Sequence, residues 1–174
     1  IFFVSGCLLF YIGNKELGYL SCLLAFSVLG FLVWNWPSAK IFMGDVGSTS
    51  LGLSVAVFML LAEKSHSLSF IIYLMLYLPF ITDATLTLLR RIIAGDKWYE
   101  AHNNHGFQRL YRSGWSHKQV LLGLITLNLV SIPIVLGAFF YPKYIYSFLV
   151  LDIALVGYSY YQIECTFPME GGCK

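Results

Sequence analysis

The sequence predicts an all-α membrane protein, a polytopic helix bundle with five full transmembrane helices and a partial one at the N-terminus. Of its 174 residues, 58% are hydrophobic and 11% are charged, and the mean hydropathy is +0.72. Soluble domains have about 45–50% apolar and about 25% charged residues. The apolar residues also gather into runs of roughly 20, the length that a bilayer-spanning helix needs. Composition and segment length therefore indicate the same fold class.

The apolar runs define the helices in order. We expect full spans at residues 17–36, 46–62, 68–89, 119–140 and 144–163, after a partial span at residues 1–12. The short connections at 13–16, 63–67 and 141–143 predict antiparallel hairpins. The connection at 90–118 is long and holds three of the four histidines, and loops of that length are usually functional or disordered. We therefore expect a transmembrane domain at residues 1–163, including this loop, and a short cytoplasmic tail at residues 164–174.

The basic residues predict the orientation in the membrane. Alternating helices put eight of them on the side of Asp45: Lys40, Arg90, Arg91, Lys97, Arg109, Arg112, Lys118 and Lys174. The other side has three, namely Lys15, Lys64 and Lys143. Because cytoplasmic segments carry an excess of Lys and Arg, the side of Asp45 and the long loop is predicted to be cytoplasmic. The net charge of +2 is too small to indicate nucleic acid.

Residues 35–48 put a carboxylate, a lysine and two glycines at the start of an apolar run. Asp45 precedes the run that begins at about Val46, so the free N–H groups of that helix start lie beside it. Helix starts attract anions, and one carboxylate plus substrate phosphates is the usual arrangement for Mg²⁺ in phosphoryl chemistry. Asp45 is therefore a candidate metal ligand. The alternative is an N-cap that accepts a hydrogen bond from Ser48.

The neighbours of Asp45 favour a site for an anionic ligand. Gly44 and Gly47 allow the backbone to approach a ligand closely, and Lys40 adds a cation. We therefore take Lys40, Gly44, Gly47 and Ser48 as candidate substrate-binding residues.

Two further aspartates lie within predicted helices. Asp83 comes about two turns before Arg90 and Arg91, and a carboxylate at that depth suggests function by default. The alternative is a structural partner for a polar residue on a neighbouring helix. The two arginines are typical of positive-inside anchors. Asp152 has no motif around it, so we expect it to pair helices.

The long connection holds His102 and His105, followed by Arg109. On spacing alone, two histidines three residues apart are a weak signal. A zinc site would need further ligands nearby, and Glu100 and His117 are only loosely eligible. A solvated loop with incidental histidines is the plainer interpretation of this spacing.

Three motifs together resemble one family. Residues 42–48, Phe-Met-Gly-Asp-Val-Gly-Ser, resemble the Phe-Met-Gly-Asp-x-Gly-Ser signature of the polyprenyl-phosphate N-acetylhexosamine-1-phosphate transferases. The helix with Pro79 and Asp83 and its basic end is similar to a second family motif. Residues 102–110 resemble the His-x-x-His-x-Tyr-Gln-Arg-Leu version of the branch that initiates O-antigen and related lipopolysaccharide glycans. Phe107 stands where those relatives often have Tyr, which keeps the ring and loses a hydroxyl.

This resemblance implies a transferase that depends on Mg²⁺, with Mn²⁺ as an alternative ion. It would move an N-acetylhexosamine 1-phosphate from a UDP-sugar to undecaprenyl phosphate, release UMP, and so start O-antigen or cell-envelope polysaccharide synthesis. The implied catalytic residues are Asp45, His102 and His105, with Asp45 also as the metal ligand. Asp83 and Arg109 would bind substrate. The implied location is the bacterial inner membrane, with the site at its cytoplasmic face.

Two other classes stay open. A transporter also carries intramembrane aspartates, but it would place its polar groups near mid-membrane. A non-catalytic lipid-binding or assembly subunit is the second. A homodimer of the enzyme stays open as well. The chain starts within an apolar run without Met, and the family's paired-aspartate and Asn-rich motifs do not occur in it. We therefore expect it to be the C-terminal part of a longer enzyme and to be inactive alone.

Overall fold

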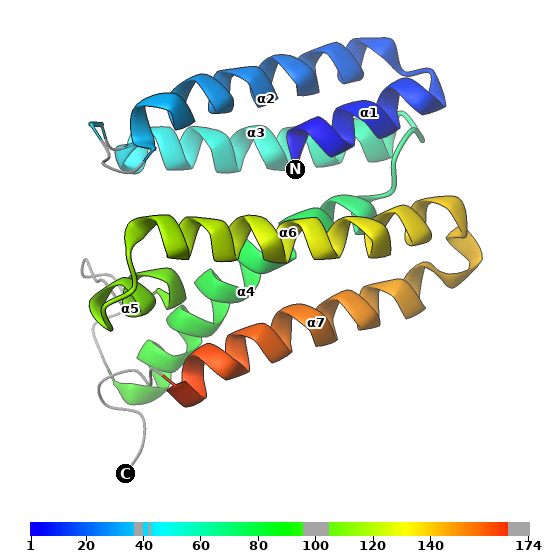
Figure 1. Cartoon of the computed structure of the whole chain (residues 1–174). Coiled ribbons are helices and arrows are strands. Elements are labelled where there is room, and N and C mark those ends of the chain that lie inside the picture. The colour runs from blue at the N-terminus through cyan, green and yellow to red at the C-terminus, as the bar shows by residue number, and fades with distance from the viewer. Residues whose placement is uncertain (37–39, 42, 96–104, 167–174) are drawn as a thin grey trace. The chain divides into compact units, whose positions relative to one another are not determined.

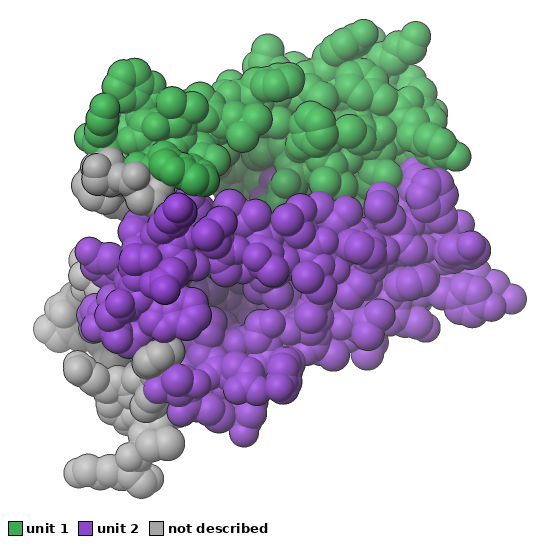
Figure 2. Space-filling view, viewed as in Figure 1, with its two compact units in different colours: residues 1–74 green, residues 75–174 purple. Residues whose placement is uncertain are grey.

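The computed structural model describes residues 1–36, 40–41, 43–95 and 105–166, and every regular element in these ranges is a helix. In chain order the elements are α1 (Phe2–Ile12), α2 (Lys15–Asn35), α3 (Gly44–Lys64), α4 (Phe70–Ala94), α5 (Gly106–Arg112), α6 (His117–Phe140), a 3₁₀ turn η1 (Pro142–Tyr144) and α7 (Ile145–Thr166) (Figure 1). The chain forms two compact units, residues 1–74 and 75–174 (Figure 2). The predicted all-α class is confirmed.

In the first unit, α1 and α2 form a close antiparallel hairpin (Figure 1). Gly13 ends α1 with a φ of 92°, a left-handed conformation that glycine adopts without strain. The hydroxyls of Ser5 and Ser21 lie 2.8 Å apart, and Ser21 also donates to the Phe2 carbonyl at 2.8 Å. Because all three groups are buried in an apolar hairpin, these bonds fix how the two helices face each other.

The two ends of α3 lie at different surfaces of the first unit. At its C-terminal end, Asn14 donates a 2.7 Å hydrogen bond to Ser67, so the α1–α2 turn meets the α3–α4 turn. The opposite end begins at Gly44, about 30 Å away along a helix of 21 residues. The meeting of the two turns agrees with the predicted topology, in which both connections lie on the side away from Asp45.

The second unit contains most of α4 together with α5, α6 and α7. Helices α6 and α7 form an antiparallel hairpin through η1 (Figure 1). Gly137 lets α6 approach Phe148 of α7, since a Cβ at that position would lie 2.6 Å from the ring. Asp152 is completely buried in α7, where a helix-pairing group was expected.

Within the described residues, four helices are long and apolar enough to span a membrane: α2, α4 and α6 over nearly their full lengths, and α3 from Val46. The fifth predicted span is present as the 22-residue helix α7, but it is not among these four. Asp152, Gln162 and several tyrosines lower its mean hydropathy. Much of the apolar surface of α2, α3 and α6 is exposed in the described part of the chain, as expected of a multi-pass membrane protein.

Two helix ends and one additional helix differ from the prediction. Helix α4 continues to Ala94, where the loop was expected from residue 90. Helix α7 continues to Thr166, so residues 164–166 are helical where a tail was expected to start. The predicted loop at 90–118 contains the short helix α5, which sequence periodicity did not indicate.

Candidate functional site

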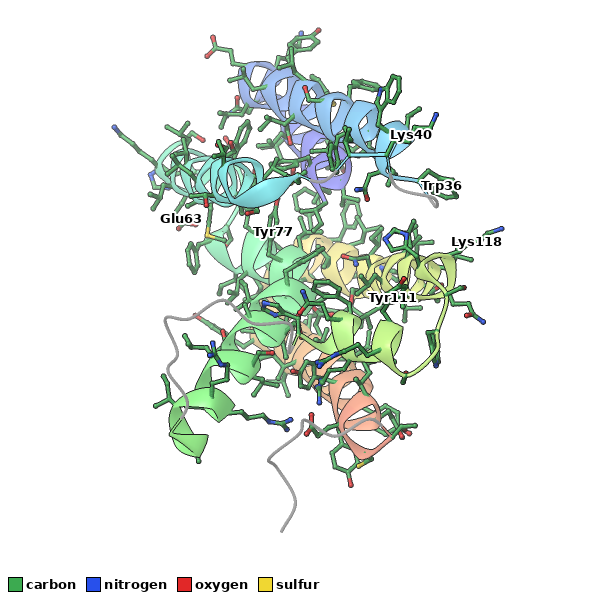
Figure 3. The ribbon with its side chains drawn as sticks, turned by 90° about the vertical axis from the view of Figure 1, so that its left-hand side faces the viewer. Trp36, Lys40, Glu63, Tyr77, Tyr111 and Lys118 are labelled. Atoms are coloured by element: carbon green, nitrogen blue, oxygen red, sulfur yellow. The ribbon has the colours of Figure 1, made fainter. Side chains whose placement is uncertain are left out.

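The candidate residues fall in both units, and each group is described within its own unit. In the first unit, the connection between α2 and α3 is held by short contacts. The Lys40 amide donates to the Trp34 carbonyl at 3.0 Å, and the Asn35 side chain donates to the Ile41 carbonyl at 2.8 Å. Lys40 itself is labelled in Figure 3. The Lys40 ammonium lies 5.7 Å from the centre of the Trp34 ring. This contact orients an exposed cation at the surface where α3 begins.

The start of α3 carries the central motif. The helix begins at Gly44 with Met43 as its N-cap, so Asp45 lies in the first turn and is not the N-cap. Gly44 has a φ of 64°, a left-handed value that a non-glycine residue would adopt only with strain. Gly47 is covered by Met43, whose Cγ would lie 2.4 Å from an added Cβ. Ser48 is exposed on the next part of the turn. Both glycines therefore have backbone and packing roles here.

In the second unit, the side chain of Asp83 in α4 contacts the start of α5. The Gly106 amide donates to Asp83 Oδ1 at 2.7 Å, and His105 Nδ1 lies 3.1 Å from Asp83 Oδ2. Asp83 is 19% exposed and His105 is 30% exposed. A carboxylate at a helix start accepts from otherwise unsatisfied N–H groups. One side chain thus fixes both the start of α5 and the histidine before it.

The residues around His105 restrict its ring further. Phe107 stacks on the imidazole with ring centres 5.7 Å apart and planes 8° apart. Gln108 Oε1 accepts a 3.2 Å hydrogen bond from the His105 amide. A Cβ at Gly106 would lie 3.0 Å from Asp83 Oδ1, so glycine is needed for this close approach. Phe107 therefore supports His105 through its ring alone.

Arg109 lies on the same short helix but faces inward. Its side chain is 4% exposed, and its Nη1 donates to Glu164 Oε2 at 2.6 Å. The guanidinium also lies 5.7 Å from the centre of the Tyr160 ring. Arg90 of α4 forms an ion pair with the same Glu164 oxygen and lies 5.9 Å from the same ring. Two cations from two helices thus share one carboxylate and one aromatic ring of α7.

The charge of Glu164 follows from these contacts. Partial burial by itself would raise the pKa of the Glu164 carboxyl, but hydrogen bonds and charge from Arg90 and Arg109 outweigh it. The net result is a pKa below the ordinary value, so this residue is a carboxylate at neutral pH.

An apolar groove lies beside this cluster. It has a volume of about 600 Å³ and is bounded by α5, α6 and α7, with Leu110, Val120, Leu124 and Leu155 among its lining residues. Leu110 belongs to α5 directly after Arg109. The groove therefore reaches the helix that carries the polar cluster. A polar pocket of about 560 Å³ in the first unit lies at the Asn14–Ser67 turns, at the end of α3 away from Asp45, and holds none of the predicted residues.

The predicted site residues are partly brought together. The second unit brings Asp83 and His105 into contact, and Arg109 lies one turn further along α5, where it pairs with Glu164. Lys40, Gly44, Asp45, Gly47 and Ser48 surround the start of α3 in the first unit. His102 and Glu100, the latter only loosely eligible as a zinc ligand, lie outside the described residues, as does the side chain of Asp45. Among the described side chains, no group of three or more His, Cys, Asp or Glu is close enough to hold a metal ion.

Comparisons with known proteins match a family model to part of the first unit and relatives to up to 79% of the chain. Residues 1–63 match the sequence model of glycosyl transferase family 4. This segment belongs to that family. The resemblance that the three motifs indicated is thereby confirmed. No solved structure matches the chain.

The relatives are transferases by their names. Two of the names include a polyprenyl phosphate, and the third includes a phospho-N-acetylmuramoyl-pentapeptide. A probable undecaprenyl-phosphate N-acetylglucosaminyl 1-phosphate transferase of Bacillus subtilis is 36% identical over 64% of this chain and 32% of its own length. A decaprenyl-phosphate N-acetylglucosaminephosphotransferase of Mycobacterium leprae is 31% identical over 71% and 35%. A phospho-N-acetylmuramoyl-pentapeptide-transferase of Thermotoga neapolitana is 28% identical over 79% and 45%. The matched part of the chain thus spans between about a third and a half of these relatives.

The sequence analysis missed three residues of the cluster in the second unit: Thr87, Tyr160 and Glu164. Tyr160 and Thr87 share a 3.3 Å hydrogen bond in the buried part of the cluster. A signal was present, because Asp83, Thr87 and Arg90 are spaced i, i+4 and i+7 on one face of α4. Polar residues at helical spacing in an apolar segment indicate a partner on another helix.

Proposed function

We propose that the full-length protein transfers an N-acetylhexosamine 1-phosphate from a UDP-sugar to undecaprenyl phosphate and releases UMP. The observation that carries this proposal is the Asp83–His105 pair at the start of α5, found in the segment with the family's histidine motif. The family match and the names of the relatives support the reaction class. The product would start an O-antigen or another cell-envelope polysaccharide.

The reaction is an exchange of one phosphorus–oxygen bond for another. A phosphate oxygen of the lipid attacks the phosphorus next to the sugar, and the bond from that phosphorus to the oxygen of UMP breaks. The negative charge that develops on UMP leaves with it. Phosphoryl transfer asks a protein mainly to align the reactants and to offset charge. Residues that donate hydrogen bonds or carry positive charge near the diphosphate therefore contribute most.

His105 is suited to contact the donor diphosphate. It is partly exposed, its Nδ1 faces Asp83, and Phe107 stacks against its ring. A histidine whose Nδ1 is held by a carboxylate presents Nε2 as the free donor or acceptor. We assign His102 the same role on the strength of the family motif alone, since it lies outside the described residues. Lys40, at the start of α3, adds a cation for the phosphates in this proposal.

Asp45 is the residue that we propose to hold Mg²⁺, with Mn²⁺ as an alternative. One carboxylate together with the substrate diphosphate fits the oxygen ligands that Mg²⁺ prefers. The open N–H groups of the first turn of α3 suit the phosphates next to it. When bound, the ion would offset charge on the phosphoryl oxygens.

The lipid substrate needs an apolar surface that ends near the charged residues. The groove between α5, α6 and α7 has this character, since it is apolar and begins next to Arg109. We propose that it takes part of the isoprenoid chain, with the lipid phosphate at the cytoplasmic surface. The excess of Lys and Arg on that side supports this orientation.

The test is UMP release by the purified full-length protein with undecaprenyl phosphate, Mg²⁺ and one donor at a time. We expect release with UDP-N-acetylglucosamine or a 6-deoxy UDP-N-acetylhexosamine. Release with UDP-N-acetylmuramoyl-pentapeptide only would assign the protein to peptidoglycan precursor synthesis and reject the O-antigen step. Absence of UMP with every donor would reject the transferase function.

A further inference from the structure

The end of α7 joins three helices in the second unit. Tyr160 and Glu164 are four residues apart, so they lie on one face of α7. Tyr160 shares a hydrogen bond with Thr87 of α4, and Glu164 pairs with Arg90 of α4 and Arg109 of α5. None of the motifs in the sequence includes this face of α7. Its contacts nevertheless reach both elements that hold His105.

The burial of Arg109 indicates what its charge does. At 4% exposure, its guanidinium is directed to Glu164 and to the Tyr160 ring rather than to solvent. Breaking one partner of a buried ion pair is strongly destabilising, because the other charge is left uncompensated. In this arrangement Arg109 works as an anchor for α5, and direct contact with the donor falls to the more exposed His105.

Glu164 controls the spacing between α4 and α5. A single oxygen of this carboxylate faces both Arg90 and Arg109. Without its negative charge, two guanidinium groups would remain side by side, and like charges at this range repel each other. The carboxylate therefore holds together two helices whose own charges would drive them apart.

Helix α5 depends on such anchors because it is short. Its seven residues are too few for a helix that is stable by itself. Asp83 holds its first residue, Gly106, and Glu164 holds Arg109 one turn later. His105 is the residue directly before this first turn of α5, which Asp83 and Glu164 hold in place. Any shift of α5 would move His105 relative to Asp83.

We propose that Glu164, supported by Tyr160, is a positioning residue that fixes α5 and thereby sets His105 for binding of the nucleotide-sugar diphosphate. This inference rests on the proposed transferase function. Groups that orient a ligand-binding histidine typically change affinity or activity by about 10- to 100-fold when they are replaced.

The test compares steady-state kinetics of the full-length protein with Glu164→Gln, Glu164→Asp and the matched control Glu16→Gln, an exposed residue of α2. We expect Glu164→Gln to raise the KM for the UDP-sugar about 10-fold or more, with the KM for undecaprenyl phosphate within about twofold of wild type. Glu164→Asp keeps the charge but shortens the side chain. Its KM for the UDP-sugar should therefore lie between those of wild type and Glu164→Gln. The control should behave as wild type.

The outcomes separate this inference from the proposed function. A purely structural Glu164 would lower the active fraction and the thermal midpoint and leave both KM values unchanged, and that result overturns the inference. If Glu164→Gln does not fold, Glu164→Asp decides, and an unchanged donor KM in that variant also overturns it. Wild-type protein that releases no UMP with any donor rejects the transferase function itself.

Discussion

Asp83 has two roles at the residue scale, because its two oxygens face different groups. Oδ1 accepts the Gly106 amide at the start of α5, and Oδ2 lies next to His105 Nδ1. The sequence motif singled out Asp83 as a probable site residue with a structural alternative. In the structure Asp83 has both the structural role and the site role, because the side chain that caps α5 also orients His105.

Replacing Asp83 should separate these two roles. Asp83→Asn keeps an acceptor for Gly106 but removes the charge beside His105, so we expect UMP release to fall about 10- to 100-fold with little loss of stability. Asp83→Ala also removes the helix cap and should cost a further 0.5–2 kcal/mol or so of stability. Thermal unfolding and UMP release by both variants check this. Equal thermal midpoints for the two variants would argue against the capping role.

Glu164 should make the stability of the second unit depend on pH. Its pKa is lowered in the folded protein, so its carboxylate stabilises the fold above the ordinary pKa of 4.5, and this contribution is lost as the pH falls through the lowered value. The thermal midpoint of Glu164→Gln should therefore lie below that of wild type at pH 7. The difference between the two thermal midpoints should become smaller at pH values below about 4.5. A constant difference across this range would contradict the ion pairs.

At the scale of elements, the helices were predictable because long apolar runs admit few other structures in a membrane. Helix α6 begins at His117, two residues before the predicted span, after the N-cap Ser116, whose hydroxyl accepts the Gln119 amide. Helix α5 was not predictable in this way. Its seven residues have no periodic apolar face, and it is held by Asp83 and Glu164, which lie 23 and 55 residues from their partners. Local sequence patterns do not predict contacts between residues so far apart in the chain.

The α6–α7 hairpin should tolerate no large side chain at Gly137. A Cβ there would already lie 2.6 Å from the Phe148 ring, so Gly137→Leu should overpack the interface and cost about 1–3 kcal/mol. Gly157→Leu is the matched control, since the same side chain would enter open space. Thermal midpoints of the two variants give the comparison. A smaller loss for Gly137→Leu than for Gly157→Leu would contradict the close packing.

At the scale of the whole molecule, the charge distribution predicts the topology. The first unit agrees with it as far as its own turns go, since Asn14 and Ser67 meet at the end of α3 away from Asp45. The candidate site was predictable in part of the second unit, where Asp83 contacts His105 and Arg109 lies one turn further along α5. Tyr160 and Glu164 were not, because the family motifs end before α7 and their partners lie on other helices. Thr87 was missed although its i+4 spacing from Asp83 was visible in the sequence.

Single cysteines should report the two sides of the membrane. In a full-length protein without its native cysteines, Lys118→Cys should be protected from a membrane-impermeant thiol reagent in intact cells, and Lys143→Cys should be labelled. The reason is the excess of basic residues on the side of Lys118. Both positions should be labelled once the membrane is opened. The reverse pattern in intact cells would place the proposed site outside the cytoplasm.

In the proposed transferase, Asp45 holds a divalent ion and His105 contacts the nucleotide-sugar donor. The most direct test is UMP release by the full-length protein with undecaprenyl phosphate and its UDP-sugar donor, with and without Mg²⁺, for wild type, Asp45→Ala and Glu16→Gln. We predict release that requires the ion in wild type and in Glu16→Gln, and a loss on the order of 100-fold or more in Asp45→Ala that still inserts in the membrane. Unchanged turnover in Asp45→Ala, or equal release without a divalent ion, would contradict this account.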